Sequence, residues 1–187
     1  MLQKPKGYEE VKAFTEFEQL ETGGHALIIT NIEPVRGSGW EAIDIFFDTT
    51  KTDKQPNYFS KNHTEGSYYF GQYRLFLPDE SKSGTDMHKY SVSALKQFIT
   101  SVERSNKGFK FDWSTWDIMK GKQVGASFGE EEYLNRDNEV RTSVKLRWFC
   151  SVDKVADQKI PKVKKLKQSS PDNFLEVDET ALPFDMA

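Results

Sequence analysis

The residue types that most often perform catalysis form no recognisable constellation in this sequence. The three histidines fall at the start of an expected strand and in two loops, without the paired spacing of a zinc site. They are His25, His63 and His88. The glycines of 37–39 (GSG) lack the lysine and the following helix of a phosphate-binding loop. Cys150, the one cysteine, excludes an internal disulfide and matches no catalytic family pattern. We therefore expect no catalytic residue and no cofactor.

A run of acidic residues offers the one route to metal-dependent chemistry. In 129–133 (GEEEY), strand alternation puts Glu130 and Glu132 on one face and sends Glu131 to the other. Two carboxylates could hold a divalent metal ion for a nuclease, but the charged rim of a hairpin explains the run more simply. We expect no metal site and keep the nuclease as a third alternative.

Alternating cations in 139–151 (EVRTSVKLRWFCS) favour binding over catalysis. A strand here would have one largely apolar face and one face with three cations and a ring. The apolar face carries Val140, Thr142, Val144, Leu146, Trp148 and Cys150. The opposite face carries Arg141, Ser143, Lys145, Arg147 and Phe149. Because cations pair with phosphates and rings stack on bases, the second face suits nucleic acid.

The run 68–78 (YYFGQYRLFLP) repeats this pattern more weakly, with two tyrosines on one face and an arginine on the other. The solvated face of an ordinary sheet is the alternative for both strands. The aromatic content of 13% exceeds what a core of this size needs, which favours binding. We expect phosphate contacts from the basic residues and stacking from the rings. The predicted nucleic-acid-binding residues are Trp40, Tyr69, Tyr73, Arg74, Arg141, Lys145, Arg147 and Phe149.

The elements that must position these residues follow the order β-β-β-α-β-β. The predicted strands are 25–34, 40–48, 68–78, 123–134 and 139–151, and the helix is 90–108. Between that helix and the fourth strand, 111–122 is expected to form a short helix or turn with Trp113 and Trp116 inward. This order is that of an OB-fold, a mainly β five-stranded Greek-key barrel. A split barrel or an α+β sandwich with the same order stays open.

The length and charge predict one such domain with appendages. A chain of 187 residues allows an N-terminal extension (1–24), a binding domain (25–151) and a tail (152–187). The net charge of −3 shows that the whole chain is not a polycation. No signal peptide or membrane-spanning run is visible, so we expect a cytoplasmic protein without a membrane partner.

The tail is divided into two blocks of opposite charge. Six lysines lie between 154 and 167, and five acids without a base lie between 172 and 187. Charge blocks outside a core are typical of disorder, and the acidic block would be repelled by a bound polyanion. Its apolar tip suits a pocket on a partner protein, although a frayed terminus is the simpler alternative. The predicted partner-binding residues are Leu182, Pro183 and Phe184.

The end of the tail resembles a known peptide. The run 178–184 (DETALPF) is similar to the acidic tip of bacterial and phage single-stranded DNA-binding proteins, which ends in an aliphatic residue, Pro and Phe. In that family the tip docks replication, recombination and repair enzymes, while an OB-fold holds the strand. Here three residues, 185–187, follow the phenylalanine, which is normally last, so the resemblance implies weaker docking or another partner.

The body resembles a narrower group. The runs 95–113 (LKQFITSVERSNKGFKFDW) and 121–134 (GKQVGASFGEEEYL), followed by a basic strand, look like a family of phage and prophage proteins from Gram-positive hosts. That family is associated with replication and recombination gene clusters. The resemblance covers about 25–187 and implies a fold and a single-strand-binding role, but no catalytic residue.

Together these observations predict a non-enzymatic phage protein that binds single-stranded DNA without sequence preference. Its tail would recruit replication or recombination proteins, and a homo-oligomer is left open. The alternative is an adaptor in a replication or recombination complex, with weak or no DNA binding.

Overall fold

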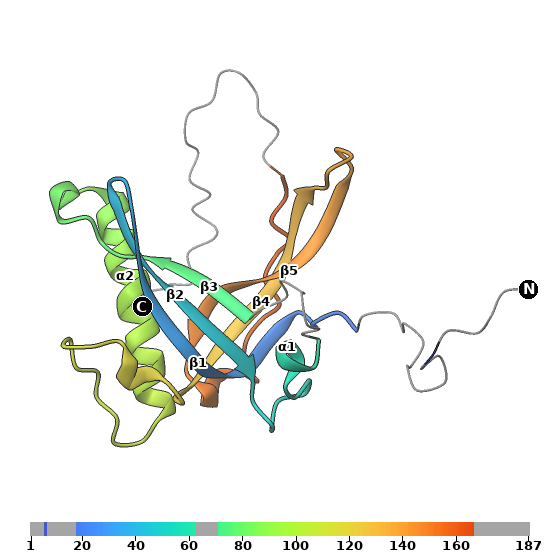
Figure 1. Cartoon of the computed structure of the whole chain (residues 1–187), viewed down its shortest axis with the longest axis horizontal. Helices are drawn as coiled ribbons and strands as arrows, with labels where there is room; N and C mark the ends of the chain where they lie inside the picture. The colour runs from blue at the N-terminus through green and yellow to red at the C-terminus, as the bar shows by residue number, and fades with distance from the viewer. Residues whose placement is uncertain (1–5, 7–17, 63–70, 167–187) are drawn as a thin grey trace, which may run out of the picture.

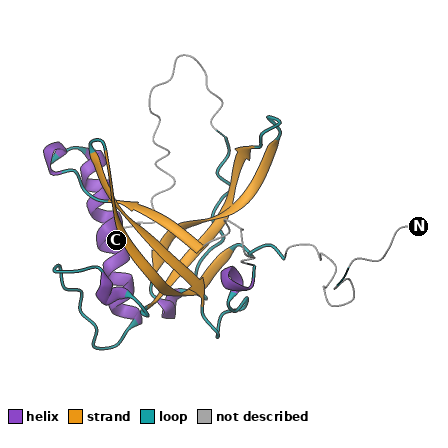
Figure 2. Ribbon diagram, in the orientation of Figure 1, coloured by secondary structure: helices purple, strands orange, loops and turns teal. Residues whose placement is uncertain are grey.

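The computed structural model describes residue 6, residues 18–62 and residues 71–166 of the chain. In this part, five antiparallel strands form one open sheet against which one long helix packs (Figures 1 and 2). The strands are β1 (Gly23–Gly37), β2 (Trp40–Thr49), β3 (Gly71–Phe76), β4 (Gln123–Leu134) and β5 (Val140–Cys150). The helices are α1 (Tyr58–Lys61) and α2 (Asp86–Ser105), with 3-10 turns η1 (Glu80–Lys82), η2 (Asp117–Met119) and η3 (Val152–Lys154). The prediction of a mainly β fold with one principal helix is confirmed.

Strand β1 joins the two halves of the sheet, whose order is β3-β2-β1-β4-β5. Residues 23–28 of β1 pair with β4, whereas most of its length pairs with β2. A register shift between Ile29 and Asn31 marks a bulge, which bends a strand locally. The β1–β2 and β4–β5 hairpins consequently rise on the same side of the molecule and diverge (Figure 1). Residues 129–145, the outer half of the second hairpin, are called the β4–β5 arm below.

Helix α2 closes the core beside the two edge strands. Its helical spacing buries Leu95, Phe98 and Val102 against the inward side chains of the sheet. Gln97 Nε2 donates a hydrogen bond to the main-chain oxygen of Phe149 in β5 at 2.8 Å, and α2 also contacts β3. The helix therefore lies near the position where β3 and β5 would otherwise meet.

Three local expectations were wrong. Strand β1 continues through Pro34 to Gly37. Proline is tolerated there because this half of β1 pairs only with β2, so no strand on its other side needs the N–H that proline lacks. Helix α2 begins at Asp86, four residues before the expected start, since the Thr85 hydroxyl accepts the N–H of His88. Trp113, expected inward, is 72% exposed, whereas Trp116 packs against the core as expected.

The lysine-rich segment was expected to be flexible, but it lies against the sheet as far as the description extends. Residues 155–166, here called the strap, cross the outer faces of β1 and β4. Glycines permit this contact, because a Cβ on Gly24 would collide with the main chain of Val155 and one on Gly129 with Pro161. Farther along, Lys164 pairs in parallel with Glu131 of β4. The strap is thus a part of the fold that sequence patterning did not reveal.

Candidate nucleic-acid interface

The outer face of β2 and β3 carries exposed rings close to a guanidinium group. Register places Phe76 opposite Ala42 and Arg74 opposite Asp44, so these side chains project on the same side as Trp40. Trp40 is 37% exposed and Phe76 is 51% exposed. Their ring centroids lie 5.5 Å apart in an edge-on arrangement. Two flat apolar surfaces are thereby held open to solvent on a rigid strand pair.

Arg74 is held in place by Asp44. Its Nε and Nη2 each donate to one carboxylate oxygen of Asp44, both at 2.7 Å. These bonds hold the pKa of Asp44 below its usual value, against the opposing effect of its burial. The guanidinium carbon also lies 5.5 Å from the centroid of the Trp40 ring. Its positive charge is therefore balanced by Asp44. Arg74 positions the Trp40 ring, and it is not an unpaired cation for phosphate.

Two of the predicted stacking rings instead belong to the core. Phe149 is 4% exposed, and its ring centroid lies 4.7 Å from that of Phe98 and 5.4 Å from that of Tyr73. Tyr73 and Arg74 project on opposite faces of β3, as expected, but Tyr73 packs against the core and therefore lies on the inner face. This burial raises the pKa of its phenol. Neither ring is available on the outer face, so their assignment as stacking residues was wrong.

A bulge in β5 explains the error at Phe149. Ser127 of β4 pairs with Trp148, whereas the next residue, Phe128, pairs with Leu146, so Arg147 is an extra residue. The insertion reverses the alternation beyond it. Leu146 and Phe149 consequently both point into the core, although simple alternation puts them on opposite faces.

The remaining predicted cations do share one face, on the β4–β5 arm. Arg141 lies opposite Tyr133 and Lys145 opposite Gly129, and both cations are exposed. The side chain of Arg141 bonds to Glu139 at 2.7 Å. Tyr133 is itself 45% exposed, which makes it the ring that sequence analysis missed on this face. An aromatic side chain among cations is the combination that single strands bind.

The strap adds basic residues next to that face and restrains one of its cations. Arg147 is only 15% exposed, and its Nη2 donates to the main-chain oxygen of Lys162 at 3.2 Å. Glu131 accepts from Lys164 at 2.8 Å and lies 3.9 Å from Arg147. The lysines of the strap without an ion pair in the described part of the chain are Lys159, Lys162 and Lys165, all exposed. The strap lysines thus add positive charge beside Arg141 and Lys145, whereas the arm itself carries five acids and three bases.

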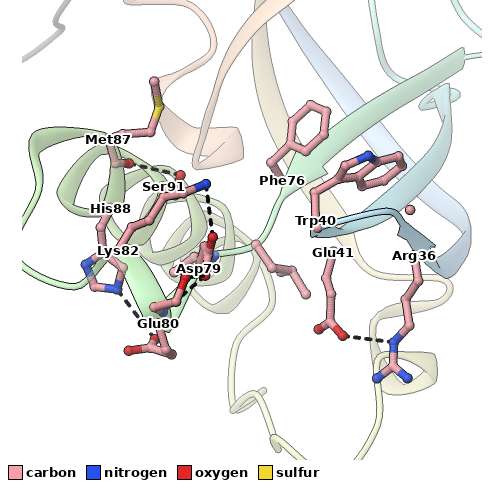
Figure 3. Close-up of a pocket in the computed structure, with 15 residues that line it drawn as sticks. Arg36, Trp40, Glu41, Phe76, Asp79, Glu80, Lys82, Met87, His88 and Ser91 are labelled. Atoms are coloured by element: carbon pink, nitrogen blue, oxygen red, sulfur yellow. Dashed lines mark hydrogen bonds and ion pairs between the residues drawn. The ribbon is translucent and has the colours of Figure 1, made fainter.

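A groove lies between the β1–β2 turn, the end of β3 and the start of α2 (Figure 3). Its volume is about 680 Å³, and its apolar lining comes from Trp40, Phe76, Leu77, Pro78 and Met87. Several of its charged residues pair with one another, with Arg36–Glu41 at 2.9 Å and Lys82–Asp79 at 3.0 Å. The groove therefore offers apolar contact with little unbalanced positive charge.

His25 and its partner serve the fold. The ring is fully buried, with Nε2 donating to the main-chain oxygen of Glu21 and Nδ1 bonded to Asp53, both at 2.9 Å. Burial raises the pKa of Asp53, but hydrogen bonds from His25, Gln55 and Ala26 outweigh it and hold that pKa below its usual value. This network fixes the start of β1.

The other candidate chemistry finds little support in the described residues. Glu131 does project away from the face of Glu130 and Glu132, as expected, and pairs with Lys164. Within residues 18–62 and 71–166, no three His, Cys, Asp or Glu side chains are grouped as metal ligands. Burial, with the nearby carboxylate of Asp153, raises the pKa of Cys150 to about 11, so this thiol is a poor nucleophile.

Several predicted residues lie outside the described part of the chain. They are Tyr69, Leu182, Pro183 and Phe184, together with His63. No protein-family model matches the chain, and no curated protein sequence matches it. In the portion described, no helix has both the length and the apolar character to cross a bilayer.

Proposed function

We propose that this protein binds single-stranded DNA through an OB-type domain, without sequence preference and without catalysis. The observation that carries this proposal is the exposed pair Trp40 and Phe76 on the outer face of β2 and β3. OB-folds bind oligonucleotides on the face of strands 2 and 3 and in the loops after strands 1 and 4. In this chain those loops are the tips of the two diverging hairpins (Figure 1). The rings thus lie where such a fold receives its ligand.

The strand order also agrees with this proposal. A helix between the third and fourth strands and an order of β3-β2-β1-β4-β5 describe a five-stranded Greek-key sheet, open between β3 and β5. The rings of Tyr73 and Phe149 touch across that opening, and α2 contacts both strands. An OB-fold is a partly open barrel of this kind.

The proposed binding mode combines stacking with a local basic surface. Bases stack on Trp40 and Phe76, while the backbone runs towards Arg141, Lys145 and the strap lysines. Tyr133 is the additional ring on the arm. Stacking tolerates any base, because every base has a π-face, and this accounts for binding without sequence preference. The resemblance of the tail tip supports recruitment of replication or recombination proteins in a bacterial cytoplasm.

A titration of labelled poly-dT and of duplex DNA at two salt concentrations tests the proposal. Poly-dT should bind much more tightly than duplex, and its affinity should fall as salt rises. Equal affinity for the two, or no dependence on salt, would remove the single-strand function.

An adaptor function is the second candidate, favoured by the groove of Figure 3. Its lining is apolar and its ion pairs are internal, which suits a hydrophobic peptide better than a phosphate. Trp40 and Phe76 line this groove as well as the proposed DNA face, so the two functions share these rings. Replacing Met87, which is 65% exposed in the groove lining, by Lys should abolish capture of an apolar peptide and leave poly-dT binding through the rings intact. Loss of poly-dT binding in this variant would show that DNA also fills the part of the groove lined by Met87.

A further inference from the structure

The outer edge of the β4–β5 arm is open on one side and covered on the other. On the β4 side the strap adds a strand: the N–H of Lys164 donates to the oxygen of Glu130, and the N–H of Glu132 donates to the oxygen of Lys164, both at 2.9 Å. On the β5 side, residues 140–146 hydrogen-bond to no strand other than β4 in the described part of the chain. Main-chain groups on such an edge are a template for another strand.

The side chains of this free edge define the strand that would fit it. Arg141 and Lys145 project on one face, and Val140 and Val144 on the other, with Val140 58% exposed. A complementary strand therefore alternates acidic and apolar residues. A second copy of β5 fits poorly, because antiparallel pairing about Ser143 sets Arg141 against Lys145, and like charges directly opposite destabilise a pair.

The chain contains a segment with the required alternation. Residues 175–179 read LEVDE, so Leu175 and Val177 share one strand face while Glu176 and Asp178 share the other. We propose that residues 175–179 add to the free edge of β5 as a further strand, with Glu176 and Asp178 on the face of Arg141 and Lys145. Leu175 and Val177 then cover the apolar face of the same edge.

The path of the strap makes this addition reachable within one chain. The strap runs parallel to β4 towards the tip of the arm, and Leu166 lies beside Glu132 near that tip. Crossing from the β4 edge to a strand outside β5 requires three strand spacings, about 14 Å. Residues 167–174 (KQSSPDNF) span up to about 26 Å when extended, and their Ser, Pro, Asp and Asn residues favour a turn. The added strand then runs parallel to β5.

Hydrogen exchange of the protein without DNA tests the docking by itself. In the full chain, outward amides among residues 140–146 should exchange at least about tenfold more slowly than in a chain ending at Pro171. Replacing Val177 and Asp178 together by Pro should remove this protection, because neighbouring N–H groups of a strand point to opposite sides and one of the two must face β5. Ala181→Pro, outside the segment, is the matched control and should retain it. Unchanged exchange in β1 and β2 confirms that each variant is folded.

Each result decides the proposal. Equal exchange of residues 140–146 in the full and shortened chains overturns it, as does protection that survives the double proline change at 177 and 178. Protection that persists in the shortened chain and falls on dilution also overturns it, since a second copy would then cover the edge. The poly-dT titration is separate: if docking is observed without DNA binding, the proposed function fails alone, and the reverse result removes only the docking.

Discussion

The outer surface of the sheet differs between its two halves. Over β1 and β4, small residues such as Gly24 and Gly125 lie against Val155 of the strap. Over β2 and β3, Trp40 and Phe76 project into solvent with no covering segment in the described part of the chain. Large rings normally gain stability by burial, so leaving them exposed on a rigid surface indicates a ligand face. Small residues covered by a fixed segment indicate a structural role for that half of the sheet.

The charges differ in the same way between the two regions. Beneath the beginning of β1, Asp53 joins buried main-chain groups and His25 into one network, so its loss leaves several groups without partners. On the open face, the pair of Asp44 and Arg74 is partly exposed and orients a ring. The covered region should therefore govern stability, and the open region should govern binding.

The largest expected effect comes from Asp53. Replacing it by Asn should lower the free energy of unfolding at pH 7 by about 3 kcal/mol, because a buried pair loses one member. The pKa of Asp53 is lower in the folded than in the unfolded chain, so its contribution is complete above the unfolded value and is lost as pH falls through the folded value. Denaturant melts should show this loss below about pH 4 in the wild type and a smaller one in the variant. If the free energy of unfolding fell equally with pH in the wild type and in the Asn variant, the carboxylate of Asp53 would not have this role.

Two glycines compare the covered and open halves directly. Gly24→Ala drives a Cβ into the strap main chain and should cost about 1–3 kcal/mol of stability. Gly37→Ala collides with the Trp40 indole, which must move from its place beside Arg74, and should cost less than Gly24→Ala, about 0.5–1 kcal/mol, because a side chain yields more easily than the main chain. Urea denaturation measures both. Similar effects in the two variants would show that the strap yields as easily as a side chain.

The strand pattern was visible in the sequence because alternation repeats over several residues. In the strand predicted at 40–48, the alternating residues Ile43, Ile45 and Phe47 are all buried. The bulge at Arg147 was not visible, because one inserted residue leaves no compositional sign, yet it places Phe149 in the core and not on the face predicted to bind nucleic acid. Assigning strand faces from two-residue alternation alone fails wherever such an insertion occurs.

The strap was missed for a different reason. Its lysines are typical of a solvated tail, and what holds the segment is main-chain pairing with β4 together with the packing of Pro161 on Gly129. A signal did exist: the glycines of 125 and 129 fall on outward positions of a strand, where a close neighbour is the usual reason for their presence. Which rings are exposed, by contrast, could be learned only from the structure, since the sequence does not distinguish the exposed Trp40 from the inward-facing Tyr73.

Two exposed tryptophans separate ligand binding from mere exposure. Trp40→Ala should weaken poly-dT binding by about 1–3 kcal/mol with little change in the salt dependence, since stacking releases no counterion. Trp113→Ala is the matched control, because Trp113 is exposed in the loop between α2 and β4 and should leave affinity unchanged. Fluorescence anisotropy of a labelled oligonucleotide measures both. A larger loss for Trp113 would move the binding face to that loop.

The smallest effect concerns two cations at the β5 bulge, Lys145 just before it and Arg147, the bulged residue. Lys145 is exposed and has no ion pair in the described part of the chain, so Lys145→Ala should lower the salt slope of poly-dT binding by about 0.7 and leave stability within about 0.5 kcal/mol. Arg147 is restrained by the Lys162 main chain, so Arg147→Ala should lower the free energy of unfolding by about 1 kcal/mol and change the salt slope less. If Arg147→Ala instead reduces the slope as much as Lys145→Ala at unchanged stability, the guanidinium leaves the strap to meet phosphate. The prediction of a phosphate contact for Arg147 would then be correct. Residues of β5 that contact the strap could in that case not be assigned to a purely structural region.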